Sequence, residues 1–213
     1  MATDSPLAAR RRDPRREATA RALIEAAESL FGQAGVDGVS TRQIGAAIGS
    51  ANTNVVAYHF GAKDALIEAV YHHRLPAIDA RRGELLDQAI AAGRAGDLPT
   101  LVGVFAQPLF EQVDGAGRHS YAAFVCGLER SGQIASRAAV TGDYPETERL
   151  MARIAALLPD GVRAQFDMRR RLAFAMIMHT LALIDRECAH DVAAAQAQFD
   201  NAVTMAAAAL AAQ

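Results

Sequence analysis

The sequence predicts an all-α protein. Its 213 residues include no Trp and only 7 Pro, and aromatic residues make up 6% of the chain. Such a composition, together with frequent alanine runs, favours helices over sheets. Apolar residues recur at helical spacing, and no segment has the alternating pattern of a strand. We expect a disordered arm over residues 1–14, a three-helix domain over 15–75 and a larger helical domain over 76–213.

The charge distribution limits the classes of partner. A net charge of -2 argues against a general binder of polyanions, so contact with nucleic acid must depend on where the basic groups lie. Residues 1–14 contain three consecutive arginines and almost nothing apolar, which predicts disorder. This basic arm either contacts phosphate or a minor groove, or is a solubilising tail.

Neither export nor membrane insertion is expected. No apolar run approaches 18 residues, and the charged N-terminus is not followed by an apolar signal segment. The sequence therefore predicts a soluble, cytoplasmic protein without a membrane partner. Cys126 and Cys188 lie in apolar helical stretches without the spacing of zinc ligands, so we expect buried, reduced thiols.

The first predicted helix spans residues 15–34 and should support the elements that follow. Gly32 and Gly35 are its predicted end. Its inward face carries Leu23, Ala26, Ala27, Leu30 and Phe31.

The stretch from Ser40 to Lys63 predicts two short helices joined by a tight turn. Ser40 or Thr41 can cap the first helix, and Gly49 ends it. Its inward positions are Ile44, Ala47 and Ile48. The second helix begins with the small polar side chains of Asn52, Thr53 and Asn54, which can meet base edges in a major groove. This pattern predicts a helix-turn-helix motif.

Further helices follow with Gly or Pro between them. Phe60 should pack inward, and Gly61 closes the second short helix. A helix over residues 62–74, with Leu66 and Val70 inward, is predicted to end before Pro76. Later helices are expected at 78–92, 98–113, 119–139, 144–158, 162–190 and 191–211, the last capped by Asp191.

The run YHFGAKDALIEAV, preceded by an amphipathic helix and a short helix-turn-helix, resembles the tetracycline-repressor (TetR) family of bacterial transcription factors. The resemblance covers Arg15 to about Arg74, with Tyr58-His59-Phe60, Gly61, Lys63 and Leu66 in register. The segment from Gly49 to Phe60 is one residue longer than the commonest family spacing. The resemblance implies an all-helical homodimer with an N-terminal DNA-binding domain and a C-terminal domain that binds a small molecule and dimerises.

Eight residues are candidates for contact with double-stranded operator DNA. Lys63 is the only lysine and lies in the first turn of a predicted helix, where the dipole also favours an anion. The candidates for phosphate contact are Thr41, Arg42, Tyr58, His59 and Lys63. The candidates for base contact are Asn52, Thr53 and Asn54, with Arg42 as a fourth. The alternatives are turn formation for the Asn and Thr residues, packing for Tyr58 and an ordinary surface position for Lys63.

A regulator of this kind needs a second site that changes the spacing of its two recognition helices. We expect a cavity after Pro76 for a small, largely apolar effector of unknown identity, connected to the helix over residues 62–74. Its candidate lining residues, for which packing in the core is the alternative, are Phe105, Phe110, Tyr121, Phe124, Cys126, Met151, Met176 and His179. Effector binding would release a repressor from its operator.

Dimerisation is expected through residues 162–211, whose small-residue stripes allow close helix packing. The run Arg169-Arg170-Arg171 either forms a solvated face or pairs with acidic groups at the rim of the interface.

Three other classes of protein compete with this prediction. An enzyme is disfavoured because the chain lacks the P-loop, HExxH, GxSxG and dinucleotide motifs. A metal sensor could use His72 and His73, or Cys188 and His190, but neither pair supplies three or four ligands. The other alternative is a helical adaptor that binds a protein partner through its first 75 residues. We therefore predict no catalytic residue, metal or cofactor.

Overall fold

The computed structural model describes residues 13–133, 144–188 and 191–212. These residues form ten helices and no strand, which confirms the all-α prediction. The predicted basic arm lies almost wholly outside them. The helices are α1 (Pro14–Ala34), α2 (Thr41–Ala47), α3 (Val55–Phe60), α4 (Lys63–Ala91), α5 (Leu98–Glu111), α6 (Ser120–Arg130), α8 (Pro145–Leu157), α9 (Asp160–Arg163), α10 (Phe166–Glu187) and α11 (Val192–Ala211).

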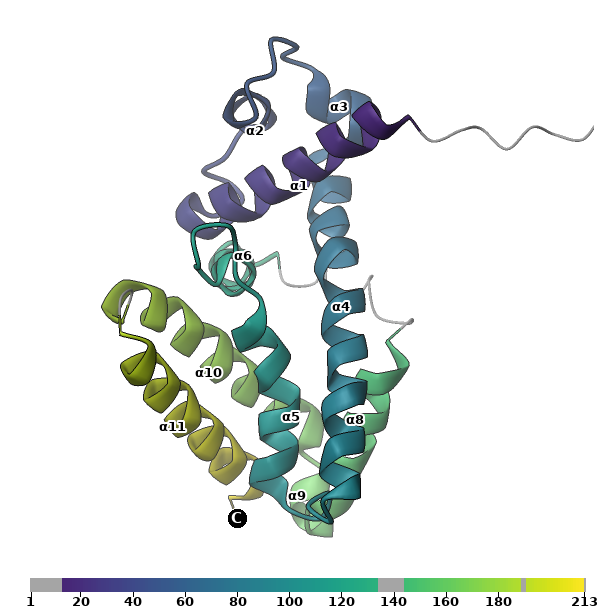
Figure 1. Ribbon diagram of the computed structural model, residues 1–213, viewed down its shortest axis with the longest axis vertical. Coiled ribbons are helices and arrows are strands. Elements are labelled where there is room, and N and C mark those ends of the chain that lie inside the picture. Colours follow the sequence, from purple (N-terminus) through teal and green to yellow (C-terminus); the bar gives the residue numbers. More distant parts are fainter. Residues whose placement is uncertain (1–12, 134–143, 189–190, 213) are drawn as a thin grey trace, which may run out of the picture.

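The long helix α4 connects the two ends of the molecule. Figure 1 shows α1, α2 and α3 around one end of α4, and α5, α8, α10 and α11 around the other, with α6 between the two groups. α4 has 29 residues, a length of about 43 Å.

Pro76 does not end the fourth helix, contrary to the prediction. α4 continues through it, so the predicted helices at 62–74 and 78–92 are one. Pro76 removes only the hydrogen bond to the carbonyl of His72, four residues earlier, and both residues are exposed to water. Apolar packing of Val70 and Ile78 on either side, both fully buried, keeps the helix continuous.

The ends of α1 follow its local capping signals. The Asp13 side chain accepts a hydrogen bond from the amide of Arg15, and Pro14 occupies the first turn, so the helix begins inside the predicted arm. Gly35 ends it with a φ of 71°. Gly32, a second predicted end, lies within the helix instead, where a Cβ would come within 2.9 Å of Ala123 Cβ on α6.

The C-terminal helices differ from the prediction in their ends. The helix predicted at 119–139 ends at Arg130, and residues 134–143 lie outside the described part. The helix predicted at 162–190 is divided into α9 and α10. Asp191 caps α11 through a 2.9 Å bond from the Ala194 amide, as expected.

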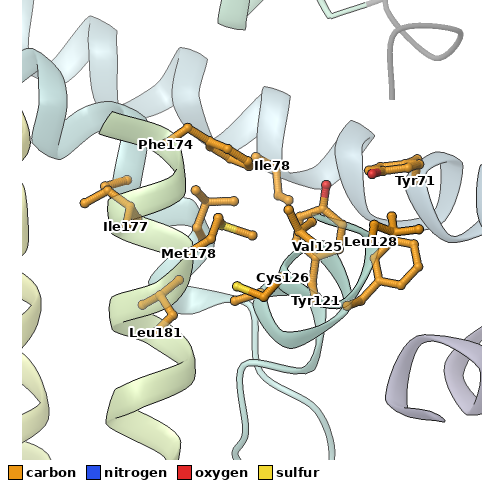
Figure 2. Close-up of a cluster of buried hydrophobic side chains, with 14 of the residues drawn as sticks. Tyr71, Ile78, Tyr121, Val125, Cys126, Leu128, Phe174, Ile177, Met178 and Leu181 are labelled. Carbon is orange, nitrogen blue, oxygen red and sulfur yellow. The ribbon is translucent and has the colours of Figure 1, made fainter. Parts of the chain in front are cut away.

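One apolar core runs through both ends of the molecule. It extends from Leu23 and Phe31 on α1 to Ala206 and Leu210 on α11. Figure 2 shows its middle, where side chains of α4, α6 and α10 meet. Both cysteines are buried and free, as predicted. Within the described residues, no helix is long and apolar enough to cross a membrane.

Candidate functional site

Helices α2 and α3 are held by local caps and by a few buried side chains. Ser40 and Gln43 form a complete capping box at the start of α2, and Gly49 turns the chain with a φ of 70°. Ile44, Val55 and Val56 are buried and attach the two helices to the core. Phe60 also packs against it, as expected. The inner face of the motif is therefore fixed, and its outer face remains in water.

Gly45 lets α2 and α3 approach closely, a role that the sequence pattern did not indicate. A Cβ at this position would lie 2.9 Å from Val55 Cγ1. Gly45 is buried, whereas Ala47, predicted to face inward, is exposed. The inward face of α2 thus includes Gly45, because this position lies against Val55 of α3.

The turn before α3 is organised by its own polar side chains. Asn52 Oδ1 accepts the Asn54 amide hydrogen at 2.9 Å, and Ser50 Oγ accepts that of Asn52 at 3.2 Å. The Asn52 carbonyl accepts from the Val55 amide at 3.2 Å. Asn52 thus makes an Asx turn and retains its side-chain NH₂ for other contacts. Thr53 and Asn54 are exposed, and the Asn54 side chain does not cap α3.

Tyr58 and His59 lie on α3 beside the N-terminal turn of α1. The guanidinium of Arg16 is 5.3 Å from the centre of the Tyr58 ring, which is 65% exposed. Burial, and then the charge of Arg16, lowers the pKa of His59 below its ordinary value of 6.5. Arg16 was not among the predicted contacts, since only tertiary packing brings it to α3. Its position in a run of arginines was the available signal.

The remaining candidates lie at helix starts. Arg42 is exposed and Thr41 half-buried in the first turn of α2. Lys63 is the first residue of α4, but its ammonium is directed toward the protein. Nζ donates to the Val36 carbonyl at 2.5 Å and lies 5.7 Å from the centre of the Phe31 ring. Lys63 therefore joins the start of α4 to the α1–α2 connection.

Taken together, the outer surface of α2, the turn and α3 carries exposed amide, hydroxyl and guanidinium groups over a rigid apolar base. These groups can donate to phosphate oxygens and meet base edges, and none forms an acid, base and nucleophile arrangement. The surface is thus suited to contact with a nucleic-acid duplex.

The predicted effector residues do not gather in one place. Phe105 and Met151 line a cavity of about 80 Å³ enclosed by α5, α8, α10 and α11. Tyr121 and Phe124 are core residues packed against Tyr71 of α4. Phe110 stacks between Phe199 and His119 beside a separate open groove. Met176 packs against the core.

Cys126 and His179 differ from the other predicted effector residues. Burial, with a smaller effect from Glu129, raises the pKa of the Cys126 thiol to about 11. The neighbours of His179 in sequence suggested a histidine in the core. Its side chain is instead 56% exposed. Its Nδ1 lies 2.9 Å from the Ala175 carbonyl.

Two polar clusters that join distant helices were not predicted. Buried Glu28 on α1 accepts from Arg74 of α4 at 2.7 and 2.8 Å and from the Ser120 hydroxyl of α6 at 2.5 Å. His119, also buried, lies 2.6 Å from Asp185 of α10 through Nδ1. The only sequence signal for the Glu28 cluster was the presence of a charged residue on an apolar helix face.

The wall of the cavity is bonded directly to α4. Asp79 accepts from the amides of Glu146 and Thr147 at 3.3 and 2.7 Å, which caps α8 from a neighbouring helix. Buried Arg82 donates to the Phe105 carbonyl at 3.1 Å and to the Thr147 hydroxyl at 2.9 Å. The α5 and α8 sides of the cavity are thus each hydrogen-bonded to α4.

The arginine run has three different environments. Arg169 donates to the carbonyls of Ala209, Leu210 and Ala212, which satisfies the C-terminus of α11. Arg170 pairs with Asp167 at 2.8 Å. Both Arg170 and Arg171 line the cavity. The predicted alternatives, a solvated face or an acidic partner at an interface, therefore do not describe Arg169.

The comparison with known families agrees with this geometry. Residues 23–70 match the family model for bacterial regulatory proteins of the tetR family. No curated protein matches the sequence. The matched segment begins within α1, contains α2, the turn and α3, and ends in the first part of α4. Residues 23–70 therefore form a DNA-binding domain of the tetR family, which indicates a DNA-binding regulator of transcription.

Proposed function

We propose that the protein is a homodimeric repressor that leaves its operator when a small, largely apolar effector enters the C-terminal domain. The observation that carries this proposal is the rigid α2–turn–α3 unit with an exposed polar face, attached by α4 to a helical bundle that contains a cavity. Residues 15–75 are the DNA-binding domain and 76–213 the effector and dimerisation domain, with α4 shared between them.

Base contact is assigned to the start of α3. Asn54 and Thr53 are exposed and have side chains free of the turn, so they can reach a major groove. Asn52 contributes through its NH₂ group, because its oxygen already serves the turn. Thr41, Arg42, Tyr58 and His59 flank this segment and contact phosphates, and Arg16 is added beside Tyr58.

The cavity between α5, α8, α10 and α11 is the proposed effector site. Its lining is mostly apolar, and Arg171 has no hydrogen bond or ion pair in the part of the chain that the structure describes. An apolar molecule with one acidic group matches this lining. At about 80 Å³ the cavity is smaller than the roughly 300 Å³ of an ordinary ligand pocket, so the effector must push the helices apart.

Widening the cavity would act on the DNA-binding end through α4. The bonds from Asp79 and Arg82 tie α4 to the α8 and α5 walls. A displacement of these walls tilts α4, which changes the distance between the α3 helices of a dimer. That distance must match about 34 to 36 Å or a multiple of the turn. Effector binding thus lowers operator affinity.

A gel shift with the DNA upstream of the protein's own coding region tests the proposal. The protein should give a shifted band that persists in the presence of competitor DNA. An apolar carboxylic acid should reduce the intensity of this band more than the matched alcohol does. Arg171→Gln should reduce this preference for the acid, whereas Arg94→Gln, at the opposite end of α4 from α3, should not. Absence of a shifted band would favour the adaptor alternative. Effector-independent binding would contradict the release mechanism alone.

Salt-dependence measurements test the phosphate role of Lys63. A phosphate contact requires Lys63→Ala to weaken binding to all sequences alike and to reduce the salt slope by about one unit. The bond to Val36 is the competing role, under which the slope stays unchanged and stability falls instead. Arg94→Ala is the matched control for lost positive charge.

Operator selection tests the base-reading role of Asn54. Asn54→Ala should relax preference at one operator position by about 1 to 3 kcal/mol. The same consensus for the variant and the parent protein would contradict this assignment.

A further inference from the structure

Three side chains with metal-binding atoms meet where α6 packs against α10. Cys126 and Glu129 are three residues apart on α6 and so share one helix face. His179 comes from α10, more than fifty residues later. Their ligand atoms all lie within 4.8 Å of one another, and no other such group of three occurs among the described residues. The fold has thus brought a sulfur, a carboxylate and an imidazole together.

The exposure of the three residues is graded from inside to outside. Cys126 is 2% exposed, and Figure 2 shows its side chain directed at α10 beside Met178 and Leu181. The Glu129 side chain is 26% exposed and that of His179 is 56% exposed. In the single chain the three ligands thus form a site that is open to water at His179 and Glu129 and dry at the sulfur.

The donor set is the one that Zn²⁺ and related divalent cations prefer. Zn²⁺ takes Cys sulfur at about 2.3 Å and His nitrogen or carboxylate oxygen at about 2.0 to 2.2 Å, in a tetrahedral arrangement. Donor atoms in such a site are separated by about 3.3 to 3.6 Å. The Glu129 Oε2 to His179 Nδ1 distance is 3.9 Å, so small side-chain rotations close the site.

The charge of the ligands also fits a divalent cation. Binding transfers the thiol proton of Cys126 to solvent and forms a metal–sulfur bond. The thiolate and the Glu129 carboxylate then balance the two charges of the cation, which limits the cost of partial burial. Nδ1 of His179 also lies 2.9 Å from the Ala175 carbonyl, so a cation held by Nδ1 takes the place of that hydrogen bond.

We propose that Cys126, Glu129 and His179 form a binding site for a divalent transition metal of the Zn²⁺ class, with water as the fourth ligand. Occupancy cross-links α6 to α10. The residues weighed from sequence for a metal sensor are not involved: His72 and His73 are consecutive on α4, and His190 lies outside the described residues.

Cobalt substitution in the full-length protein, without DNA, tests this site. Metal-free protein titrated with Co²⁺ should take up one equivalent per chain and develop thiolate-to-cobalt absorption, which Zn²⁺ abolishes. Added Zn²⁺ should also raise the melting temperature. Because no DNA is present, the result is independent of the proposed repressor function.

Variants at the exposed ligands distinguish a built site from fortuitous binding. His179→Gln and Glu129→Gln should each weaken Co²⁺ binding by roughly tenfold or more. Cys126→Ser should remove the thiolate absorption, and Cys188→Ser and His72→Gln are the matched controls. If Cys126→Ser fails to fold, the two exposed variants decide. Unchanged binding in both of them, or no thiolate absorption in the parent protein, would overturn the proposal.

Discussion

Individual charged residues in this protein join helices that are distant in sequence. Glu28 is 1% exposed, yet its carboxylate has three donors from α4 and α6. Asp79 and Arg82 perform the same task between α4, α5 and α8. Buried charges persist only where such partners satisfy them.

Loss of the Glu28 carboxylate should therefore be costly. Glu28→Ala leaves Arg74 largely buried without its ion pair, so we expect the free energy of unfolding to fall by about 3 to 5 kcal/mol in urea denaturation. Glu111→Ala, which breaks the more exposed pair with Arg81, should cost less than about 1 kcal/mol. Equal effects at both positions would contradict this explanation.

Histidine burial predicts a loss of stability in mild acid. Burial, followed by the charge of Arg74, lowers the pKa of His73 below 6.5 in the folded protein. The unfolded chain then binds the proton more strongly, so stability decreases as pH falls through 6.5 toward the folded-state pKa. Glu111 and Asp114 remain ionised there, because their pKa values are lowered. His59 shifts in the same direction.

Urea denaturation at about pH 7.5 and about pH 5.5 measures this effect. His73→Gln should reduce the difference in the free energy of unfolding between the two conditions. The exposed neighbour His72→Gln leaves the half-buried ring in place and serves as control. An unchanged difference in His73→Gln would show that other groups cause the pH dependence.

At the scale of helices, the contact of α1 with α6 depends on small residues that let the two backbones approach closely. A Cβ at Gly127 of α6 would lie 2.3 Å from the Phe31 carbonyl oxygen of α1. Gly32 faces Ala123 at the same crossing, and Ser131 accepts the Val36 amide hydrogen at 3.2 Å. Helix α1 is thus in direct contact with α6 through backbone atoms.

Gly127→Ala should disturb this crossing. Because the obstructing atom is backbone, α1 must move, and we expect a loss of about 1 to 3 kcal/mol in stability and weaker operator binding. Gly96→Ala, where the added methyl meets open space, should change stability little. Thermal melts and the gel shift measure the two effects, and parallel behaviour of the two variants would refute the close-packing argument.

At the scale of the whole molecule, the apolar face of α10 is the surface that bears on dimerisation. Met168, Leu172 and Leu183 are 54%, 61% and 36% exposed, and their spacing places them on one side of the helix. Val192 and Met205 of α11 are also exposed. Apolar side chains gathered on the two helices predicted to dimerise favour burial against a second copy.

A charge within that face should separate the dimer. Leu172→Glu places a carboxylate in an apolar interface, so sedimentation or light scattering should report monomers at concentrations where the parent protein is dimeric. Leu157→Glu, an exposed leucine of α8 outside the face, is the matched control. Dimeric Leu172→Glu protein would place the interface elsewhere.

The predictions that held depend on local signals. Ser40 and Asp191 cap their helices, and Gly35, Gly49 and Gly61 turn the chain with positive φ, because these interactions involve residues only a few positions apart. The helix-turn-helix motif and the family resemblance could therefore be predicted from the sequence alone.

What only the tertiary structure decided are the contacts across long separations. Helix α4 continues through Pro76 because neighbouring helices bury both of its halves. The ammonium of Lys63 reaches Val36, and Arg16 reaches Tyr58, through the packing of α1. Cys126 and His179 meet only because α6 lies against α10. Sequence by itself determined the helices and the family, since these follow from short-range spacing. Which side chains share a site depended on how the helices pack.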